Sequence, residues 1–446
     1  MSSTLDALVS LISSSVAEYT EQLTNAQLPL PDLNSPSPPV TRTGLSEEAR
    51  LKAARSVKII EAACAQLVAT VADPGNVILT KSTAYEKSAC LQVAIDYKIA
   101  DLLLQKPDGV HVTTLAEATN IEEDKLSRIL RLLATTHVFT EVRPNVFANN
   151  RLSIELTSSA NVGPVVDIVS TGEQLKAAGY LNDYLRDPSQ GLPFKRLYGQ
   201  SIMEYFTDPK NLARRQIWGK GIASWIDPAG QDAMHKAFPW SERLSASKPL
   251  TICDIGAGNG HVTLDLLKDF ESKPIQAIVQ DLPPVLEMAK GFWEENYPRG
   301  IKDNKVKFVP INFFEDSPAE GADYYYMRFC LHNWSDELFV KIVGNVAQSM
   351  KKSGPECRFL IHDITLDHPV SDPESPPRYD EAPAPLLSNF GASRYREYAG
   401  DLNMMILLDS KERSVKQMQA LWSQAGLAFE RLYPAGDASI IELKLA

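Results

Sequence analysis

A glycine-rich segment near the middle of the chain has the composition of a ligand-binding turn. The apolar run Ile252-Cys253-Asp254-Ile255 leads into Gly256-Ala257-Gly258-Asn259-Gly260, after which a helical pattern begins. Glycines at such a turn permit positive φ values and let the backbone approach a ligand closely. The third glycine arrives one residue earlier than the dinucleotide fingerprint requires. The spacing therefore disfavours a nicotinamide cofactor and leaves two interpretations, a binding turn and a tight structural turn.

Polar and aromatic residues follow the next two predicted strands. Asp281 ends the strand pattern at 275–280, about twenty residues after the glycine turn, where a carboxylate can accept hydrogen bonds from ribose hydroxyls. The same aspartate could also cap the following helix. At the end of the third strand, Asn312 could offer an amide to adenine, and Phe313 could stack on it or belong to the core. The G-x-G-x-G form resembles that of S-adenosylmethionine methyltransferases.

One histidine lies where it could act as a general base. The segment Cys330-Leu331-His332-Asn333-Trp334-Ser335-Asp336 follows the fourth predicted strand, at the sheet edge where doubly wound folds bind ligands. Ser335 can cap the next helix and hold His332 at its entrance. A phenol has a pKa near ~10 and an imidazole near ~6.5, so a neutral histidine can accept a hydroxyl proton at neutral pH. The other six histidines lack a comparable setting.

The elements that position these residues alternate between strand and helix. Strand patterns at 250–255, 275–280, 306–309, 324–327 and 358–364 are separated by helical patterns. Such alternation predicts an α/β fold with a doubly wound, largely parallel sheet and helices on both faces. Near the end of the chain, Ser414 and Gln417 form a capping-box pattern, and two closing strands follow.

The N-terminal part has a different organisation. Apolar residues at spacings of three and four predict one helix in the first 25 residues and a second over 46–70 with Ser46 as its N-cap. Five prolines between residues 27 and 44 indicate an extended linker. An apolar helix is expected over 89–104.

A winged-helix order follows that helix. Thr114 with Glu117, and Asn120 with Glu123, have the spacing of capping boxes that begin two short helices. Two short strand patterns flanking Arg143-Pro144 then predict a hairpin. Three helices followed by a wing form a module that often binds DNA.

The charge of this module argues against DNA binding. Its second short helix opens with Glu122, Glu123 and Asp124, which would face phosphates where a groove-reading helix needs basic residues. A transcriptional regulator therefore remains a remote alternative. We favour a dimerisation module, because the apolar faces of these helices must be covered. The expected assembly is a homodimer.

Composition supports the same reading. The 446 residues contain 45 Lys and Arg against 56 Asp and Glu, a net charge of −11, which disfavours nucleic acid as a partner. No run of eighteen apolar residues predicts a membrane span, and the first residues, with Asp6 and no basic flank, do not predict a signal peptide. Five scattered cysteines without a CxxC pair indicate reduced thiols and a cytoplasmic protein. No residue spacing predicts a metal site.

Taken together, these motifs resemble the plant-type caffeic acid O-methyltransferase family and its fungal relatives, from about residue 78 to the end. The resemblance implies S-adenosylmethionine as cofactor and His332 as general base, in a segment that is usually His-Asp-Trp-Ser-Asp. It implies that two carboxylates orient this base, Asp363 in Ile361-His362-Asp363-Ile364 and Glu412 in Lys411-Glu412-Arg413-Ser414. On the cofactor side it implies six residues: Gly256, Gly258, Asp281, Asn312, Phe313 and Arg328. Three residues differ from the plant pattern. Plant members have Glu at the position of Asp363, Asp at that of Asn312 and usually Lys at that of Arg328.

Two segments are candidates for shaping an acceptor pocket. Met404 and Asp409 precede Glu412, and methionine sulfur can contact an aromatic ring, although a helix core stripe explains the same pattern. Trp334 is a further candidate. A proline-rich stretch at 372–385, followed by Leu386-Leu387-Ser388-Asn389-Phe390, is an insertion relative to plant members and is either a lid or a solvated loop.

The expected protein is thus an S-adenosylmethionine-dependent O-methyltransferase that acts on a hydroxyl of a small aromatic acceptor, such as a phenol or polyketide. N-methylation, or another reaction on the same fold, is the alternative. Four segments are predicted: a helix and linker over 1–45, a winged-helix dimerisation domain over 46–150, a helical connecting and substrate-shaping region over 151–245, and a Rossmann-like catalytic domain over 246–446.

Overall fold

The computed structural model describes residues 3–36, 44–170, 173–226, 234–244, 249–373 and 380–446. The chain forms two compact units. The first comprises Met1–Pro228 and Ala382–Tyr395, and the second comprises Ala229–Glu381 and Arg396–Ala446. Residues 37–43 of the predicted linker, 374–379 of the predicted insertion and the predicted boundary at 245–246 lie outside the described residues.

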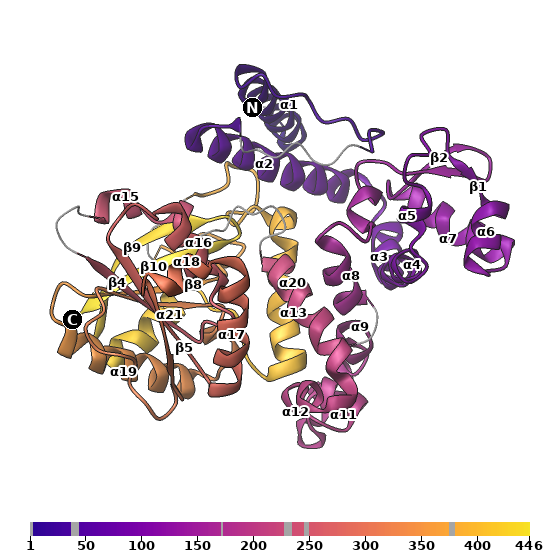
Figure 1. Cartoon of the computed structure of the whole chain (residues 1–446). Helices are drawn as coiled ribbons and strands as arrows, with labels where there is room; N and C mark the ends of the chain where they lie inside the picture. Colours follow the sequence, from indigo (N-terminus) through magenta and orange to yellow (C-terminus); the bar gives the residue numbers. More distant parts are fainter. Residues whose placement is uncertain (1–2, 37–43, 171–172, 227–233, 245–248, 374–379) are drawn as a thin grey trace. The chain divides into compact units, whose positions relative to one another are not determined.

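The second unit is built on a seven-stranded sheet with the order β6-β5-β4-β7-β8-β10-β9. Figure 1 shows this sheet with helices beside it, among them α17 and α19. The five strands from β4 to β8 pair in parallel, and β10 pairs antiparallel with β8 and β9. This order confirms the predicted doubly wound α/β fold. The elements are α14 (Met234–Ala237), α15 (Trp240–Arg243), β4 (Leu250–Ile255), α16 (His261–Asp269), β5 (Ile275–Asp281), α17 (Pro283–Asn296), α18 (Pro298–Lys302), β6 (Val306–Pro310), β7 (Tyr324–Arg328), η5 (Leu331–Asn333), α19 (Asp336–Ser353), β8 (Arg358–Asp363), α20 (Tyr395–Leu408), α21 (Val415–Trp422), η7 (Ser423–Ala425), β9 (Leu427–Ala435) and β10 (Ala438–Leu445).

A hydrophobic core lies on each face of this sheet. On one face, Leu264 of α16 and Trp293 of α17 pack against strand residues such as Ile252. On the other face, Phe339 of α19 and Trp422 of α21 pack with buried residues of the same strands. The strands are therefore apolar on both sides, as buried parallel strands require. Their carboxyl ends bring together the loops that carry the predicted site.

The first unit is mainly helical, and its helices begin with α1 and α2, which pack against each other. Helix α2 starts where the sequence predicts, with Ser46 as its N-cap, and the N-cap of α1 is Ser3. The elements are α1 (Thr4–Asn25), α2 (Glu47–Val71), α3 (Pro74–Ser82), α4 (Ala84–Asp96), α5 (Ile99–Leu102), β1 (Val110–His111), α6 (Val112–Thr119), α7 (Glu123–Thr135), β2 (Thr140–Arg143), β3 (Val146–Ala148), η2 (Ser153–Leu156), α8 (Val162–Ser170), α9 (Glu173–Ala178), α10 (Leu181–Arg186), η3 (Pro188–Gln190), α11 (Pro193–Tyr198), α12 (Ile202–Thr207), η4 (Pro209–Asn211), α13 (Leu212–Ile226) and η6 (Gly391–Arg394).

The winged-helix order is present, with three local differences from the sequence prediction. The expected helix over 89–104 is broken into α4 and α5, because Lys98 adopts a left-handed conformation with φ of 52°. Helix α6 begins at His111, whose side chain accepts the Thr113 N–H, and not at a Thr114 capping box. Asn120 is not the N-cap of α7 but the left-handed C-cap of α6, a conformation that asparagine tolerates.

The acidic start of α7 lies on the surface. Glu122 pairs with Lys125 at 2.7 Å, and Glu123 accepts a hydrogen bond from Thr113. The apolar side of α7 faces a core that includes Leu126, Leu130 and Phe147 of β3. The exposed face of this helix is therefore acidic, as the sequence indicates.

The second half of the proline-rich insertion packs against α2. Leu386 and Phe390 are buried with Ile59 and Ala63 of α2. The Gln66 side-chain amide donates a hydrogen bond to the Pro385 carbonyl at 3.0 Å. Residues 382–394 are thus anchored on the N-terminal helices, which favours a structural role for this part of the insertion over a solvated loop.

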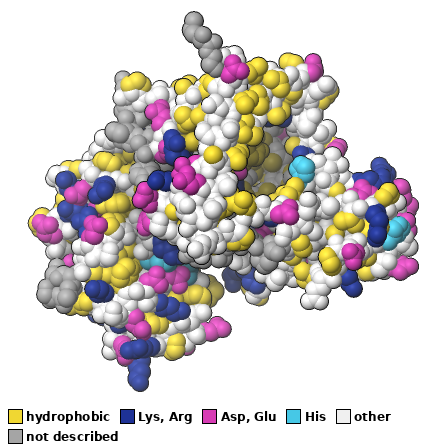
Figure 2. All heavy atoms as spheres, turned by 90° about the horizontal axis from the view of Figure 1, so that it is seen from above, with side chains coloured by type: hydrophobic (Ala, Val, Ile, Leu, Met, Phe, Trp, Pro, Cys, Tyr) yellow, Lys and Arg dark blue, Asp and Glu magenta, His cyan; other side chains and the backbone are white. Residues whose placement is uncertain are grey.

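Several large apolar residues of the N-terminal helices remain exposed. Val68 and Val71 end α2, and Ile78 and Leu79 lie on α3, each with more than half of its surface accessible. Figure 2 shows hydrophobic side chains gathering on the face that is seen from above. Surface of this kind is typical of a protein contact.

Candidate active site

The glycine turn lies between β4 and α16, and its three glycines serve different purposes. Gly256, Gly258 and Gly260 all have positive φ, at 67°, 60° and 71°. A Cβ on Gly260 would lie 2.9 Å from Nε1 of Trp293, which donates a hydrogen bond to the Asn259 carbonyl. A Cβ on Gly258 would meet no atom within 4 Å. The backbone at Gly258 is therefore open to a ligand, whereas Gly260 is required by packing.

Asp281 at the end of β5 is tied to this turn. Its Oδ2 atom accepts a hydrogen bond from the Gly258 N–H at 2.9 Å, and its Oδ1 atom accepts one from Leu282 at 2.7 Å. Burial raises the pKa of Asp281, while these two backbone donors oppose the rise. The arrangement fixes a carboxylate beside the open glycine, and each of its oxygens keeps a second lone pair for a ligand hydroxyl.

The other predicted cofactor residues lie at the ends of β6 and β7. A Cβ on Gly256 would lie 3.4 Å from the Phe313 ring and 3.3 Å from Cys330 Sγ, so three loops meet at this glycine. The Asn312 side-chain oxygen accepts the Phe314 N–H at 3.3 Å and orders its own turn. The Nε atom of Arg328 is buried and has no hydrogen-bond partner. A buried donor without a partner is costly and fits a site that receives a ligand.

His332 and Glu412 form the closest polar contact of the predicted catalytic set. His332 lies on η5, directly after β7, and Glu412 precedes α21. The His332 Nδ1 atom lies 2.6 Å from Glu412 Oε1, and their side chains are 13% and 2% exposed. Burial alone would lower the pKa of His332, but the charge and hydrogen bond of Glu412 raise it to about 9.

Asp363, the second predicted carboxylate, ends β8. Burial raises its pKa to about 7, against the influence of the nearby His332. Its charge raises the pKa of His332 in turn. The Oδ1 atom of Asp363 and the Oε2 atom of Glu412 are both buried without a hydrogen-bond partner. The site therefore holds two carboxylates around one imidazole, and one oxygen of each carboxylate can still accept a hydrogen bond.

The three candidates for acceptor binding have different surroundings. The Trp334 ring packs edge-on against Phe314, with ring centroids 4.8 Å apart, and is a partly buried neighbour of the core that includes Phe339. Met404 is half-buried on α20. Asp409 is exposed in the turn after α20, with φ of 55°.

Several buried polar groups near the site were not singled out from the sequence. The Tyr326 hydroxyl lies 2.8 Å from Nδ1 of His362, which is fully buried in β8. Asp254 in β4 is hydrogen-bonded by the Thr263 hydroxyl, and burial raises its pKa to about 7. For Asp254, a charged residue inside an apolar strand pattern was the available sequence signal.

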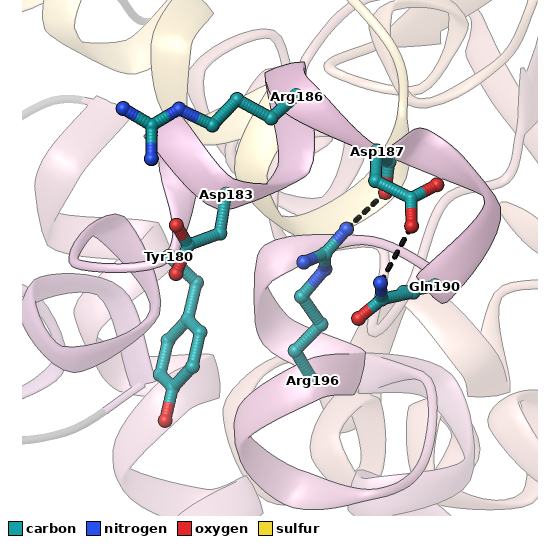
Figure 3. Close-up of a pocket in the computed structure, with 6 residues that line it drawn as sticks. All are labelled: Tyr180, Asp183, Arg186, Asp187, Gln190 and Arg196. Atoms are coloured by element: carbon teal, nitrogen blue, oxygen red, sulfur yellow. Dashed lines mark hydrogen bonds between the residues drawn. The ribbon is translucent and has the colours of Figure 1, made fainter.

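A separate pocket of about 600 Å³ lies in the first unit, near the turn from α10 to α11 (Figure 3). Its Arg196 guanidinium donates to the carbonyls of Asp187 and Gly191, and the Gln190 amide donates to Asp187 at 2.5 Å. These hydrogen bonds brace the turn between the two helices. The lining residues are Tyr180, Asp183, Arg186, Asp187, Gln190 and Arg196.

Across the described ranges, no group of three or more His, Cys, Asp or Glu side chains could hold a metal ion. Among the same residues, no helix is both long and apolar enough to cross a membrane.

Comparison with known proteins assigns the family. A model of the O-methyltransferase domain matches residues 179–428, more than half of the chain. The chain belongs to the O-methyltransferase family. An O-methyltransferase dimerisation domain matches residues 81–159, which contain the winged-helix elements. These matches confirm the predicted family and the S-adenosylmethionine-dependent O-methyltransferase activity.

Fungal relatives align over nearly the whole chain. The 3-O-methyltransferase 2 of Phanerochaete chrysosporium is 40% identical over 445 residues, covering 98% of this chain and 97% of that protein. The O-methyltransferase gedA of Aspergillus terreus is 29% identical, covering 86% and 85% of the two chains.

Solved structures share the architecture. Mitomycin 7-O-methyltransferase MmcR is 25% identical, with a TM-score of 0.66, and the alignment covers 85% of this chain and 100% of that one. The complex of LepI with S-adenosylmethionine has a TM-score of 0.69 at 20% identity, and the alignment covers 91% of this chain and 96% of that one. At this identity the comparison shows a similar fold and nothing more.

Proposed function

We propose that this O-methyltransferase methylates a hydroxyl group of a small aromatic acceptor, with His332 as the general base. The contact between His332 Nδ1 and Glu412 Oε1 is the observation that supports this role. Because Nδ1 is engaged by the carboxylate, Nε2 is the nitrogen that can receive the acceptor's proton. Glu412 and Asp363 would then stabilise the imidazolium that forms.

The raised pKa of His332 places a condition on this role. With a pKa of about 9, the imidazole is mostly protonated at pH 7 in the ligand-free protein. The imidazole of His332 must be neutral to accept a proton. A positive charge nearby would disfavour the protonated imidazole and so lower its pKa. S-adenosylmethionine supplies such a charge, together with the methyl group that it carries as a sulfonium. We therefore infer that cofactor binding favours the neutral, active form of His332.

The cofactor residues are proposed to act as follows. Gly256 and Gly258 let the backbone approach the cofactor, and Asp281 accepts hydrogen bonds from ribose hydroxyls. Phe313, which lies against the glycine turn, offers a face for adenine, and Asn312 is close to it in the sequence. The unpartnered Nε of Arg328 provides a donor for an acidic group of the ligand.

The assembly and the acceptor site are also part of the proposal. The match to a dimerisation domain and the exposed apolar residues of α2 and α3 support a homodimer. The five cysteines are all free, which supports a reducing cytoplasmic environment. Met404, Asp409 and Trp334 are proposed to shape the acceptor site. The helices within 151–245 keep their proposed connecting and substrate-shaping role.

A matched set of acceptors tests the proposal. Methyl transfer from labelled S-adenosylmethionine is measured to one aromatic ring that carries a hydroxyl, an amine or a methoxy group, and to an aliphatic alcohol of similar size. The hydroxyl compound should be methylated, and its kcat/KM should rise with pH as His332 loses its proton. Transfer to the amine alone, or to an aliphatic hydroxyl in preference to every phenol offered, would contradict the proposed acceptor class.

A further inference from the structure

Arg413 directly follows Glu412 and is one of the most deeply buried charges in the second unit. Its side chain is only 2% exposed. A buried guanidinium is costly unless it is fully paired, because it has lost its hydration. The identity of its partners therefore shows what the residue does.

The partners of Arg413 surround His332 in the sequence. Its Nη2 atom donates to the Trp334 carbonyl at 2.7 Å, and its Nη1 atom donates to the Leu331 carbonyl at 3.3 Å. These carbonyls belong to the residues one before and two after the histidine. The guanidinium thus holds the backbone turn of η5 from which the His332 side chain projects.

The same guanidinium is anchored to α19. Arg413 Nε donates to Asp336 Oδ1 at 2.9 Å, and Asp336 is the first residue of that helix. The guanidinium carbon also lies 5.1 Å from the centroid of the Phe339 ring. Lys411 pairs with the other Asp336 oxygen at 2.8 Å, but it is 45% exposed and contacts neither carbonyl of η5.

The backbone around Arg413 is fixed on its other side. The Leu366 N–H donates to the Arg413 carbonyl at 3.2 Å, and Thr365 pairs with Arg413 as a parallel bridge. These residues lie two and three positions after Asp363, which ends β8. The Glu412 N–H donates to Asp401 of α20 at 2.8 Å. The segment that carries Glu412 is therefore held between α20 and the chain after β8.

We propose that Arg413 is a positioning residue that sets the distance between Glu412 and His332 by clamping their two segments together. The inference rests on the proposed role of His332. A contact of 2.6 Å between residues 80 positions apart needs such a brace, because neither segment belongs to a long helix or strand at that point. Displacements of about 1 Å in a catalytic group can lower the rate about 10²-fold.

Arg413→Lys is the first test, since lysine keeps the charge but lacks the planar fork that reaches several acceptors at once. We expect kcat to fall about 10- to 100-fold, with unchanged affinity for S-adenosylhomocysteine. The pKa of His332, followed by NMR titration of its imidazole, should fall because Glu412 is held less closely. Lys411→Met is the matched control and should leave both readouts unchanged. An unaltered His332 titration in Arg413→Lys would overturn the proposal.

Two further measurements keep the test decisive. If Arg413→Lys does not fold, Asp336→Asn removes the more exposed anchor of the clamp and should shift the His332 titration in the same direction. In a double-mutant cycle, adding Arg413→Lys to Glu412→Gln should cost little beyond Glu412→Gln alone, whereas additive losses would overturn the clamp. Normal turnover by His332→Ala would instead show that the base assignment is wrong, whatever the cycle gives.

Discussion

The Nδ1 atom of His332 lies 2.6 Å from the Oε1 atom of Glu412, although the two residues are 80 positions apart in the chain. The histidine comes from the turn after β7 and the glutamate from the segment before α21. Because the glutamate is almost fully buried, its charge acts on the imidazole with little screening by water. This pair determines both the tautomer and the protonation of the proposed base.

Replacing the base should abolish most of the chemistry without affecting the cofactor. His332→Ala is expected to lower kcat about 10²- to 10⁴-fold, the usual contribution of a general base. Calorimetry should show unchanged binding of S-adenosylhomocysteine. His368→Ala, which alters an exposed histidine, serves as the control. Turnover near that of the wild type would remove His332 from the proposed mechanism.

The stability contributed by the His332–Glu412 pair should depend on pH. The folded pKa of His332, about 9, is higher than the value near ~6.5 expected in the unfolded chain. A raised pKa stabilises the folded state fully below about pH 6.5, and this stabilisation is lost as the pH rises through 9. The difference in thermal midpoint between the wild type and Glu412→Gln should therefore narrow from pH 6.5 to 9.5. A constant difference across this range would contradict the raised pKa.

Asp281 should control cofactor affinity. Hydrogen bonds to a charged group contribute about 1.5–3 kcal/mol, so Asp281→Ala should weaken S-adenosylmethionine binding about 10- to 100-fold. The variant also loses the acceptor for the Gly258 N–H, which orders the turn. Asp265→Ala, at an exposed position of α16, is a suitable control. Equal dissociation constants for the wild type and Asp281→Ala would exclude the ribose contact.

Asp254 should also make the folded state less stable as the pH rises, in the same direction as the His332–Glu412 pair. Its folded pKa of about 7 lies above the usual aspartate value because burial disfavours the charged form. A raised carboxyl pKa adds no cost below about pH 4 and a growing cost as the pH rises through 7. Asp254→Asn cannot ionise and can still accept the Thr263 hydrogen bond. Its thermal midpoint should therefore improve relative to the wild type between pH 5 and 8; a decline over that interval would refute the raised pKa.

The anchored part of the insertion should stabilise the N-terminal helices. Phe390 is 4% exposed, packs with Ile59 and Ala63, and lies 6.0 Å from the Arg55 guanidinium. Truncating a buried phenylalanine costs about 3–5 kcal/mol, so Phe390→Ala should speed proteolysis within residues 382–394. Tyr395→Ala, at a side chain that is 75% exposed, should behave as the wild type does. Equal cleavage rates for the two variants would show that this packing contributes little.

Much of the fold could be predicted from local patterns. Strand and helix periodicities gave the order of elements in the second unit, and Ser335 and Ser414 cap α19 and α21 as predicted. Helix caps and hydrophobic periodicity can be predicted from the sequence because they depend on residues within one or two helical turns of each other. The local predictions were wrong at Lys98, at the start of α6 and at Asn120. Lys98 and Asn120 adopt left-handed conformations that end a helix, and the side chain of His111 caps α6 in place of Thr114.

The sequence by itself determined the inventory of the site: a glycine turn, an aspartate after the next strand, a histidine at a helix entrance and, through family resemblance, two carboxylates. It did not determine which groups touch. Three contacts join segments that are far apart in the chain. Glu412 contacts His332, Arg413 donates hydrogen bonds to the carbonyls of Leu331 and Trp334, and Phe390 packs against α2. Such contacts depend on how side chains pack around two cores, and periodicity carries no information about partners at that separation. Only the tertiary structure therefore decided how the predicted residues are held together.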